Sequence, residues 1–539
     1  MSIIKRFAST KLQQFVIFML ATLLTTHIVL AHDGKHKADN IAKPERVLGH
    51  LTFATSSHSK EAQDAFEQGM LLLHLFEYPF AIAEFKKAQS IDSHFAMAYW
   101  GEAMAYNYPI WDMQFRDKAQ NALNAFAPTI EQRQAKLKTK KEKDYFKSLD
   151  ILYGLANSDT SKYQRDMAYK HFLSEMAQRY PGDVEVQLFY ALAILGSHGG
   201  VRDIPDYMEA AAIAQKGFYA NRQHPGAAHY LIHAVDDPIH APLGLEAARA
   251  LYKMAPDAGH SLHMTSHIFN ALGMWDDVVM ANTNAVKVAN HMRAERGEPA
   301  SHVGHYNFWL LYGLLQQGNF AQAKQLLETA YEEITHLAKP PKAPMILDPD
   351  SDPVGSLLQM WSRYVFETGG TDTEVLNWTF NLQDAFDPNL NLLYVKAFMA
   401  KDPERIRALK KQYKELVAKL RRTIMTLPEK EMFFLEYLKR TEVIEQQLEA
   451  FEQRAKGNLA AAIASATKAS ELEGAMPYEF GPPFVDYPSA QLLGELNLIQ
   501  GNYADAAAAF AEALKRARNK VQAVKGLAQA RDAMGQQLK

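Results

Sequence analysis

Apolar residues recur at intervals of three and four along most of this chain, which is the spacing of one face of an α-helix. The pattern begins near Glu61 and continues with short breaks, and almost no stretch shows the two-residue alternation of a β-strand. Two proline-rich segments interrupt it, residues 338–354 and 474–489. Residues 32–58 lack a helical period and are expected to form a flexible leader. The pattern predicts an all-α protein.

One set of small and aromatic residues repeats within these predicted helices. Gly69, Ala81, Phe85 and Ala88 stand at the separations of a tetratricopeptide repeat (TPR), in which small residues let two antiparallel helices touch and an aromatic ring fills the space between them. Further copies align at Gly273 and Trp275; at Gly318, Phe320, Ala323 and Ala330; at Gly457, Ala462 and Ala469; and at Gly494, Gly501, Tyr503, Ala506, Phe510 and Ala513. These copies predict a TPR-like α-solenoid of antiparallel helix pairs.

The breaks divide the predicted array into parts. We expect an N-terminal solenoid with a histidine-rich centre over residues 59–337, a proline-rich loop over 338–354, a helical segment over 355–455, and C-terminal repeats with a cap helix over 456–539. The last helix, near residues 519–535, is rich in Lys, Arg and Gln, as the solvent-facing end of a solenoid requires.

The first 31 residues have the pattern of a secretory signal peptide. Lys5, Arg6 and Lys11 precede a mostly apolar run, and Val29 and Ala31 occupy the −3 and −1 positions of a cleavage site. A periplasmic or secreted protein of a bacterium is therefore expected. The alternative is an uncleaved anchor, which would be the chain's contact with a membrane.

Charge and cysteine content narrow the classes of function. The formal net charge is −3, from 58 basic and 61 acidic residues, so no basic excess favours binding to nucleic acid. The chain has no cysteine, which excludes disulfides, thiolate metal ligands and thiol catalysis. No phosphate-binding loop, dinucleotide fingerprint or HExxH zinc motif is present either.

Histidines are concentrated at the centre of the chain. Ten of the twenty lie between His224 and His305, and nine of these fall in the three clumps HPGAAHYLIHAVDDPIH, GHSLHMTSH and SHVGH. His229 and His233 are four residues apart, and His263 and His267 repeat that spacing, so each pair would share one face of a helix. Imidazoles that converge from neighbouring helices suit transition metals.

We therefore hypothesise a metal site with His229, His233, His263 and His267 as ligands, and Zn or Cu as the favoured ions because no thiolate is present. Residues that could add ligands or orient the imidazoles are His224, His260, His302, His305, Asp236 and Asp237. The alternative interpretation is that these histidines pack between helices and bond to carbonyl groups or carboxylates. Asp236 and Asp237 precede Pro238 and are also expected to end a helix.

Three segments resemble a group of bacterial, often exported, TPR proteins: residues 68–105, the motif HPGAAHYLIHA and the motif GHSLHMTSHI. Thr265 stands where members of that group usually have a proline, which puts the start of a helix there in doubt. The resemblance implies a TPR fold and export, and it implies no particular reaction.

Two functions from different classes remain open. The first is an exported scaffold that binds a protein or peptide partner, the commonest use of stacked helix pairs, with a histidine-lined site in the solenoid. The second is a metal-dependent enzyme that uses the histidine cluster between residues 224 and 305, in which three ligands and an open position would activate water or oxygen.

Overall fold

The computed structural model describes residues 46–156, 159–199, 201–336, 353–380, 382, 386–426, 432–478 and 480–537. The expected signal peptide, the first part of the expected leader and most of the expected 338–354 loop lie outside these residues. Contacts divide the chain after Arg46, and residues Val47–Lys539 form one unit.

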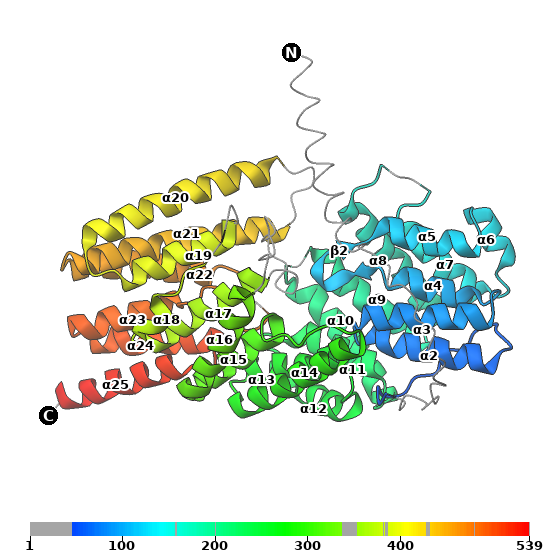
Figure 1. Ribbon diagram of the computed structural model, residues 1–539, viewed down its shortest axis with the longest axis horizontal. Coiled ribbons are helices and arrows are strands. Elements are labelled where there is room, and N and C mark those ends of the chain that lie inside the picture. The colour runs from blue at the N-terminus through cyan, green and yellow to red at the C-terminus, as the bar shows by residue number, and fades with distance from the viewer. Residues whose placement is uncertain are drawn as a thin grey trace, which may run out of the picture. The chain divides into compact units, whose positions relative to one another are not determined.

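The first part of the unit is a run of helices joined mostly by short turns, with consecutive helices packed against each other (Figure 1). The helices are α2 (Lys60–His74), α3 (Tyr78–Ile91), α4 (Ala96–Met104), α5 (Arg116–Phe126), α6 (Ile130–Lys136), α7 (Lys140–Leu152), α8 (Lys162–Arg179), α9 (Val184–Leu195), α10 (Ile204–Ala220), α11 (Pro225–Val235), α12 (Leu245–Met254), α13 (Gly259–Ala271) and α14 (Trp275–Glu295). Short 3₁₀-turns lie between some of them: η1 (Pro109–Trp111), η2 (Gly196–His198) and η3 (Ala241–Gly244). The strands found in the described residues are β1 (Asn107–Tyr108) and β2 (Met113–Gln114), which pair antiparallel.

The second part continues the same design. Its helices are α15 (His305–Gln316), α16 (Phe320–Thr335), α17 (Pro353–Thr368), α18 (Thr373–Leu376), α19 (Phe386–Met399), α20 (Pro403–Met425), α21 (Met432–Ala455), α22 (Leu459–Gly474), α23 (Ser489–Gln500), α24 (Tyr503–Arg516) and α25 (Val521–Gln537). The predicted all-α class of antiparallel helix pairs is confirmed. None of the helices in the described part of the chain combines the length and the apolar character that a membrane span requires.

The TPR-like packing follows from the residues that define the repeat. The ring of Phe85 lies between α2 and α4, where a Cβ added at Gly69 or Gly101 would approach its Cε1 to 2.6 and 2.5 Å. The last repeat has the same arrangement, because Gly494 and Gly526 both face the ring of Phe510. Each aromatic ring therefore fills a space that exists because two neighbouring helices carry glycine.

The turn within each helix pair usually needs a left-handed residue. Gly273, Gly318, Gly457 and Gly501 take this position after the first helix of their pairs, with φ between 68° and 83°. In the first pair the position belongs to Phe76, at φ 58°. The amide groups of Phe76 and the next residue donate to carbonyl groups near the end of α2, the hydrogen-bond pattern of a glycine-ended helix. A bulky residue in this conformation is strained, which makes Phe76 an exception among the repeats of this chain.

Part of the expected leader belongs to the core. Residues 46–59 have no helix, yet Leu48, Leu51 and Phe53 are buried. The ring of Phe53 meets Phe66 of α2 edge to face at a centroid distance of 5.3 Å. The flexible leader predicted up to residue 58 therefore does not extend over residues 47–58, because three large apolar side chains are buried there.

The C-terminal repeat contacts the middle of the chain. The indole Nε1 of Trp275 at the start of α14 donates to the carbonyl oxygen of Asn519 at 3.0 Å. Next to it, the buried Lys520 Nζ donates to both carboxylate oxygens of Glu367 in α17 at 2.6 and 2.7 Å. The residues that lead into helix α25 are thus held by elements far away in the sequence.

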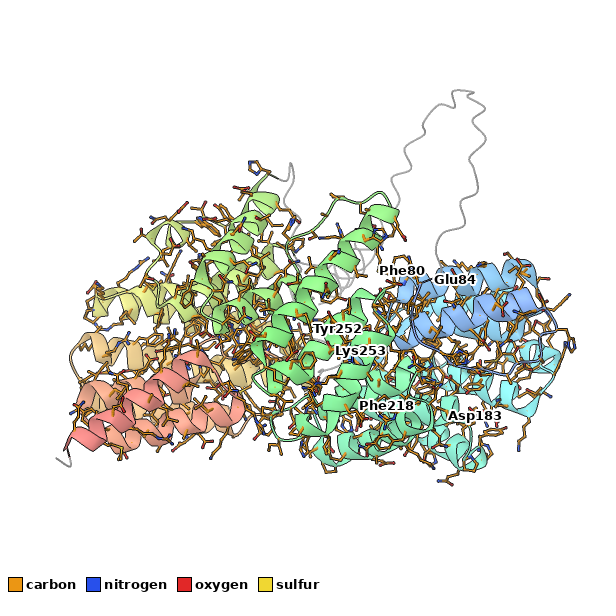
Figure 2. The ribbon with its side chains drawn as sticks, turned by 90° about the horizontal axis from the view of Figure 1, so that it is seen from below. Phe80, Glu84, Asp183, Phe218, Tyr252 and Lys253 are labelled. Atoms are coloured by element: carbon orange, nitrogen blue, oxygen red, sulfur yellow. The ribbon has the colours of Figure 1, made fainter. Side chains whose placement is uncertain are left out.

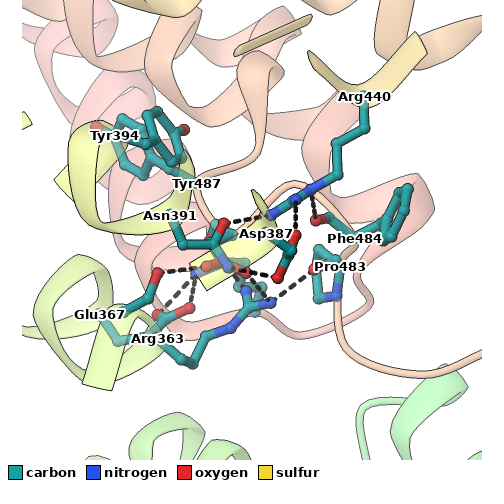
Figure 3. A network of polar contacts seen from close by, with 12 residues as sticks. Arg363, Glu367, Asp387, Asn391, Tyr394, Arg440, Pro483, Phe484 and Tyr487 are labelled. Atoms are coloured by element: carbon teal, nitrogen blue, oxygen red, sulfur yellow. Dashed lines mark hydrogen bonds and ion pairs between the residues drawn. The ribbon is translucent and has the colours of Figure 1, made fainter. Parts of the chain in front are cut away.

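A buried ion network holds the connection between α22 and α23 in place (Figure 3). Arg363 of α17 donates to the carboxylate of Asp486 at 3.0 Å, and Arg440 of α21 donates to the carbonyl oxygen of Phe484 at 2.8 Å. Arg440 also pairs with the carboxylate of Asp387 at 3.2 Å. Because each charged group has a partner of opposite sign, the network fixes this Pro-rich connection (residues 475–488) against the helices.

Candidate functional site

Six histidines from three helices form two adjacent groups of three. The first group, triad 1, consists of His229 and His233 of α11 and His260 of α13; the second, triad 2, consists of His263 and His267 of α13 and His305 of α15. Within each triad one ligand nitrogen per ring lies within 4.8 Å of the others. The single site predicted from the sequence, with His229, His233, His263 and His267 as ligands, is thus divided between two neighbouring triads. His260 completes the first triad and His305 the second, and the sequence predicts both only as possible additional ligands.

The two triads adjoin each other. The ring centroids of His233 and His267 are 6.0 Å apart, and those of His260 and His263 are 6.2 Å apart. Five of the six residues are buried, with exposed fractions from 0% to 8%, and His305 at the start of α15 is half-buried. The triads therefore form one continuous histidine-lined interior between α11, α13 and α15.

In triad 2 the hydrogen bonds determine which ring nitrogens face inward. His267 Nδ1 donates to the carboxylate of Asp236 at 2.8 Å, and His263 Nδ1 donates to the side-chain oxygen of Asn282 at 2.7 Å. With the protons on Nδ1, both Nε2 atoms carry lone pairs, and these two atoms lie 3.1 Å apart. Two lone pairs that face each other repel unless a cation lies between them.

Triad 1 presents unpartnered nitrogens. His229 Nδ1 donates to the carbonyl oxygen of His74, the last residue of α2, at 2.6 Å, which leaves its Nε2 as an acceptor. This Nε2, both ring nitrogens of His233 and the Nε2 of His260 are buried without a hydrogen-bond partner. An unsatisfied buried polar atom costs about 1–3 kcal/mol, so this concentration of them in one place needs an explanation.

Five of the six histidines are held neutral. Burial, together with the neighbouring imidazoles, lowers the pKa of His233, His260 and His263 well below the usual value. Burial lowers the pKa of His229 and of His305 to about 3. Neutral imidazole is the form that binds metal ions.

Aromatic rings enclose both triads. The ring of Phe76 lies 4.4 Å from His229 and stacks on His233 at 5.6 Å. The indole of Trp309 stacks on His267 at 4.4 Å and meets His263 edge to face at 4.9 Å. The strained backbone of Phe76 thus places an apolar ring directly against triad 1.

Two loops complete the surroundings. The guanidinium of Arg296 lies 5.3 Å over the ring of Phe80, which is labelled in Figure 2, and so anchors the α14–α15 loop before His305 to helix α3. On the other side the Pro-rich connection packs on Trp309, the aromatic neighbour of triad 2, because Gly481 faces its indole with no room for a side chain. The histidine-lined interior is therefore closed by segments from distant parts of the chain.

Asp236 links triad 2 to a buried arginine. It ends helix α11, as its position before Pro238 predicts, and its second oxygen accepts from the guanidinium of Arg202. Arg202 is also within 3.4 Å of Asp237 and lies over the ring of Phe480 at 4.6 Å. The carboxylate of Asp236 thus contacts the arginine through one oxygen and fixes the tautomer of His267 through the other.

A third group of titratable residues is satisfied without a metal ion. Glu185 accepts from His74 Nε2 at 2.8 Å and from His224 Nε2 at 3.0 Å. The remaining nitrogens accept from the hydroxyl of Tyr230 and from the amide of Ala227. Burial opposes ionisation of Glu185, but both histidines outweigh it and hold its pKa at about 2. His224 therefore belongs to this structural group and to neither triad.

The other predicted residues are placed as follows. His302 lies outside the triads and bonds to Glu333 through Nδ1 at 3.0 Å. Asp237 accepts a hydrogen bond from His240 Nδ1 at 2.8 Å. Within the described part of the chain it makes no hydrogen bond to a triad histidine. Sequence reasoning missed the groups that orient the rings, namely the carbonyl of His74 and the side chain of Asn282, because each comes from another part of the chain with no spacing that connects it to the histidines.

Comparison with known proteins adds little to this description. No model of a known protein family matches the chain, and no curated protein is significantly similar to it. Similar solved structures include yeast Tom70 (TM-score 0.34, 13% identity, 89% of this chain and 96% of that chain) and Cut9 with Hcn1 from the APC/C (0.30, 12%, 88% and 78%). The TPR domain of P58(IPK) is a further one (0.17, 13%, 89% and 99%). At these values the likenesses carry no conclusion, so the fold rests on the helix contacts described above.

Proposed function

We propose that this protein binds two transition-metal ions, one at each histidine triad. The observation that carries the proposal is the pair of Nε2 atoms of His263 and His267, 3.1 Å apart with both Nδ1 protons committed to Asn282 and Asp236. Two nitrogens bound to one tetrahedral ion at about 2.0–2.1 Å would lie about 3.3 Å apart. The spacing thus suits a shared ion.

A shared proton would be the alternative cation. Burial and the neighbouring His305 lower the pKa of His263, which disfavours protonation of this pair. A metal ion also accounts for the unpartnered nitrogens of triad 1, which a single proton between His263 and His267 would leave unexplained.

The donor set favours Cu or Zn. All six donors are imidazole nitrogens, which suit these ions, whereas Mg²⁺ and Ca²⁺ prefer oxygen ligands. Three protein ligands per ion leave a position for water, oxygen or a substrate. Hydrogen bonds from His267 to Asp236 and from His229 to the carbonyl of His74 are the orienting contacts that metal-bound histidines usually make.

Elemental analysis of the full-length protein tests the proposal. Protein loaded with Cu²⁺ or Zn²⁺ and then desalted should hold two ions per chain. His260→Ala and His305→Ala should each remove one ion, while His302→Ala, a histidine of the same segment outside both triads, should keep two. Protein that holds no ion after loading, or variants that hold as many as the wild type, would refute it.

Binding of a protein or peptide partner is the second candidate, and one observation favours it. An apolar groove of about 490 Å³ lies among α17–α20, lined by Trp361, Trp378, Phe380 and Leu392, with Lys396 and Arg405 among its lining residues. Such a groove suits an apolar segment flanked by acidic residues. Leu392→Glu should abolish capture of such a peptide and leave the metal content unchanged; capture that survives it would refute this candidate.

Export through the N-terminal segment is part of the same proposal. Signal cleavage after Ala31 would leave an exported, cysteine-free metalloprotein. Mass spectrometry of the mature protein should give an N-terminus at His32. An intact Met1 in material from the periplasm or medium would contradict it.

A further inference from the structure

We infer that the metal-loaded triads bind a small anion between the two ions, so that the ligands of this site are anions of one to three atoms such as hydroxide, a halide or azide. This inference rests on the proposed function. It follows from the charge, the packing and the access of the six histidines.

The protein does not balance the charge of two divalent ions. All six donors are imidazole nitrogens, which bring no charge when they bind a metal ion. Asp236 bonds to His267 and Glu77 accepts from the amide of His260, and the carboxylates of Asp236 and Asp237 pair with the guanidinium of Arg202. These three carboxylates and one guanidinium carry a net charge of −2. Two divalent ions would bring a charge of +4 into a buried site. Uncompensated buried charge is costly, so the surplus favours one or two bound anions.

An anion between the two triads would compensate more positive charge than an anion bound to one ion alone. His233 and His260 of triad 1 lie against His267 and His263 of triad 2, with centroid distances of 6.0 and 6.2 Å. Each ion has an open position, and an anion shared by both ions compensates two charges at once.

The ligand must be small. Phe76 and Trp309 pack directly on the histidine rings at 4.4 Å, which leaves no space for a large organic body against either triad. The more exposed groups beside the triads are Trp111, which is 38% exposed and 5.6 Å from His260, and the half-buried His305. We therefore expect a ligand of a few atoms to enter from this side and the packed aromatic rings to disfavour larger anions.

Titration of the full-length, copper-loaded protein with sodium azide tests the inference. Metal content is measured first. Protein that holds two Cu²⁺ ions should develop a ligand-to-metal absorption band that saturates at one azide per two ions. His305→Ala, which leaves one ion, should weaken azide binding at least tenfold, and His302→Ala should leave it unchanged. A bulky anion such as benzoate should not compete.

The outcomes separate the two proposals. Two bound copper ions without azide binding, or with azide affinity that His305→Ala does not change, would overturn the inference and leave the metal site standing. Protein without copper would overturn both. His305→Gln, which keeps a polar side chain at the start of α15, serves as the second variant if His305→Ala does not fold, and circular dichroism checks both.

Discussion

Replacement of His233 by leucine separates a metal ligand from a packing residue. Both ring nitrogens of His233 are buried without a hydrogen-bond partner, although a neutral imidazole carries one donor and one acceptor. An unsatisfied buried group costs about 1–3 kcal/mol, and leucine has a similar volume with no polar atom. His233→Leu should therefore stabilise the metal-free protein by about 1–3 kcal/mol. At about 2.1 cal/mol/K of unfolding entropy per residue, the Tm should rise by about 1–3 °C.

In the metal-loaded protein, the loss of one ion should offset this gain. An ion present at a hundred times its Kd stabilises the folded state by about 2.7 kcal/mol per site. Because His233→Leu removes a ligand of triad 1, the increase in Tm on adding metal should fall to about half of the wild-type increase. Thermal unfolding with chelator and with Zn²⁺, combined with native mass spectrometry to count ions, measures both effects.

A matched control lies one turn earlier in the same helix. His229 donates to the carbonyl oxygen of His74 at 2.6 Å, so His229→Leu should lose the same ion but destabilise the metal-free protein, because that carbonyl loses its partner. The reasoning is wrong if His233→Leu destabilises the metal-free protein and leaves the number of bound ions unchanged.

Three further predictions concern the surroundings of the site and the repeats. Asp236→Asn should lower the affinity of triad 2 for Zn²⁺ by about 10–100-fold in competition titrations, because His267 loses its carboxylate partner; an unchanged Kd would contradict this. In the metal-free protein, burial lowers the pKa of His229 and of His305 to about 3, below the value of about 6.5 in the unfolded chain, so the unfolded chain binds more protons between pH 6.5 and about 3. The stability present above pH 6.5 should therefore be lost as the pH falls, by up to about 1.4 kcal/mol per unit for each histidine, in urea titrations; a flat profile would exclude it. Gly494→Ala should destabilise the last repeat by about 1–3 kcal/mol, because the new Cβ would lie 2.8 Å from the ring of Phe510, whereas Gly474→Ala meets no atom within 4 Å and should be close to neutral; equal effects in thermal unfolding would argue against the packing described.

The repeats could be predicted because their determinants are local. Gly69 and Phe85 belong to one helix pair, and the same separations return in the last repeat. The extended segment with Phe53 could not be predicted in this way, since its burial depends on a surface that α2 and other helices create together. Periodicity describes a single element, and it says nothing of what covers that element.

The histidine site shows the same limit. The spacing of His229 and His233 on one helix was sufficient to place them together. It did not show that His260 would join them while His263, three residues later, turns toward His305, because that division depends on how α13 crosses its two neighbours. The aromatic walls and the carbonyl of His74 likewise come from other helices.

Phe76 offers a way to look for functional positions in repeat proteins. Four other helix pairs of this chain place glycine at the left-handed position of the turn, so the chain itself supplies the rule that Phe76 breaks. A departure of this kind costs backbone energy, and it persists where the side chain has a task that glycine cannot perform. Comparison of the repeats of one molecule with each other thus identifies the face on which that task is carried out.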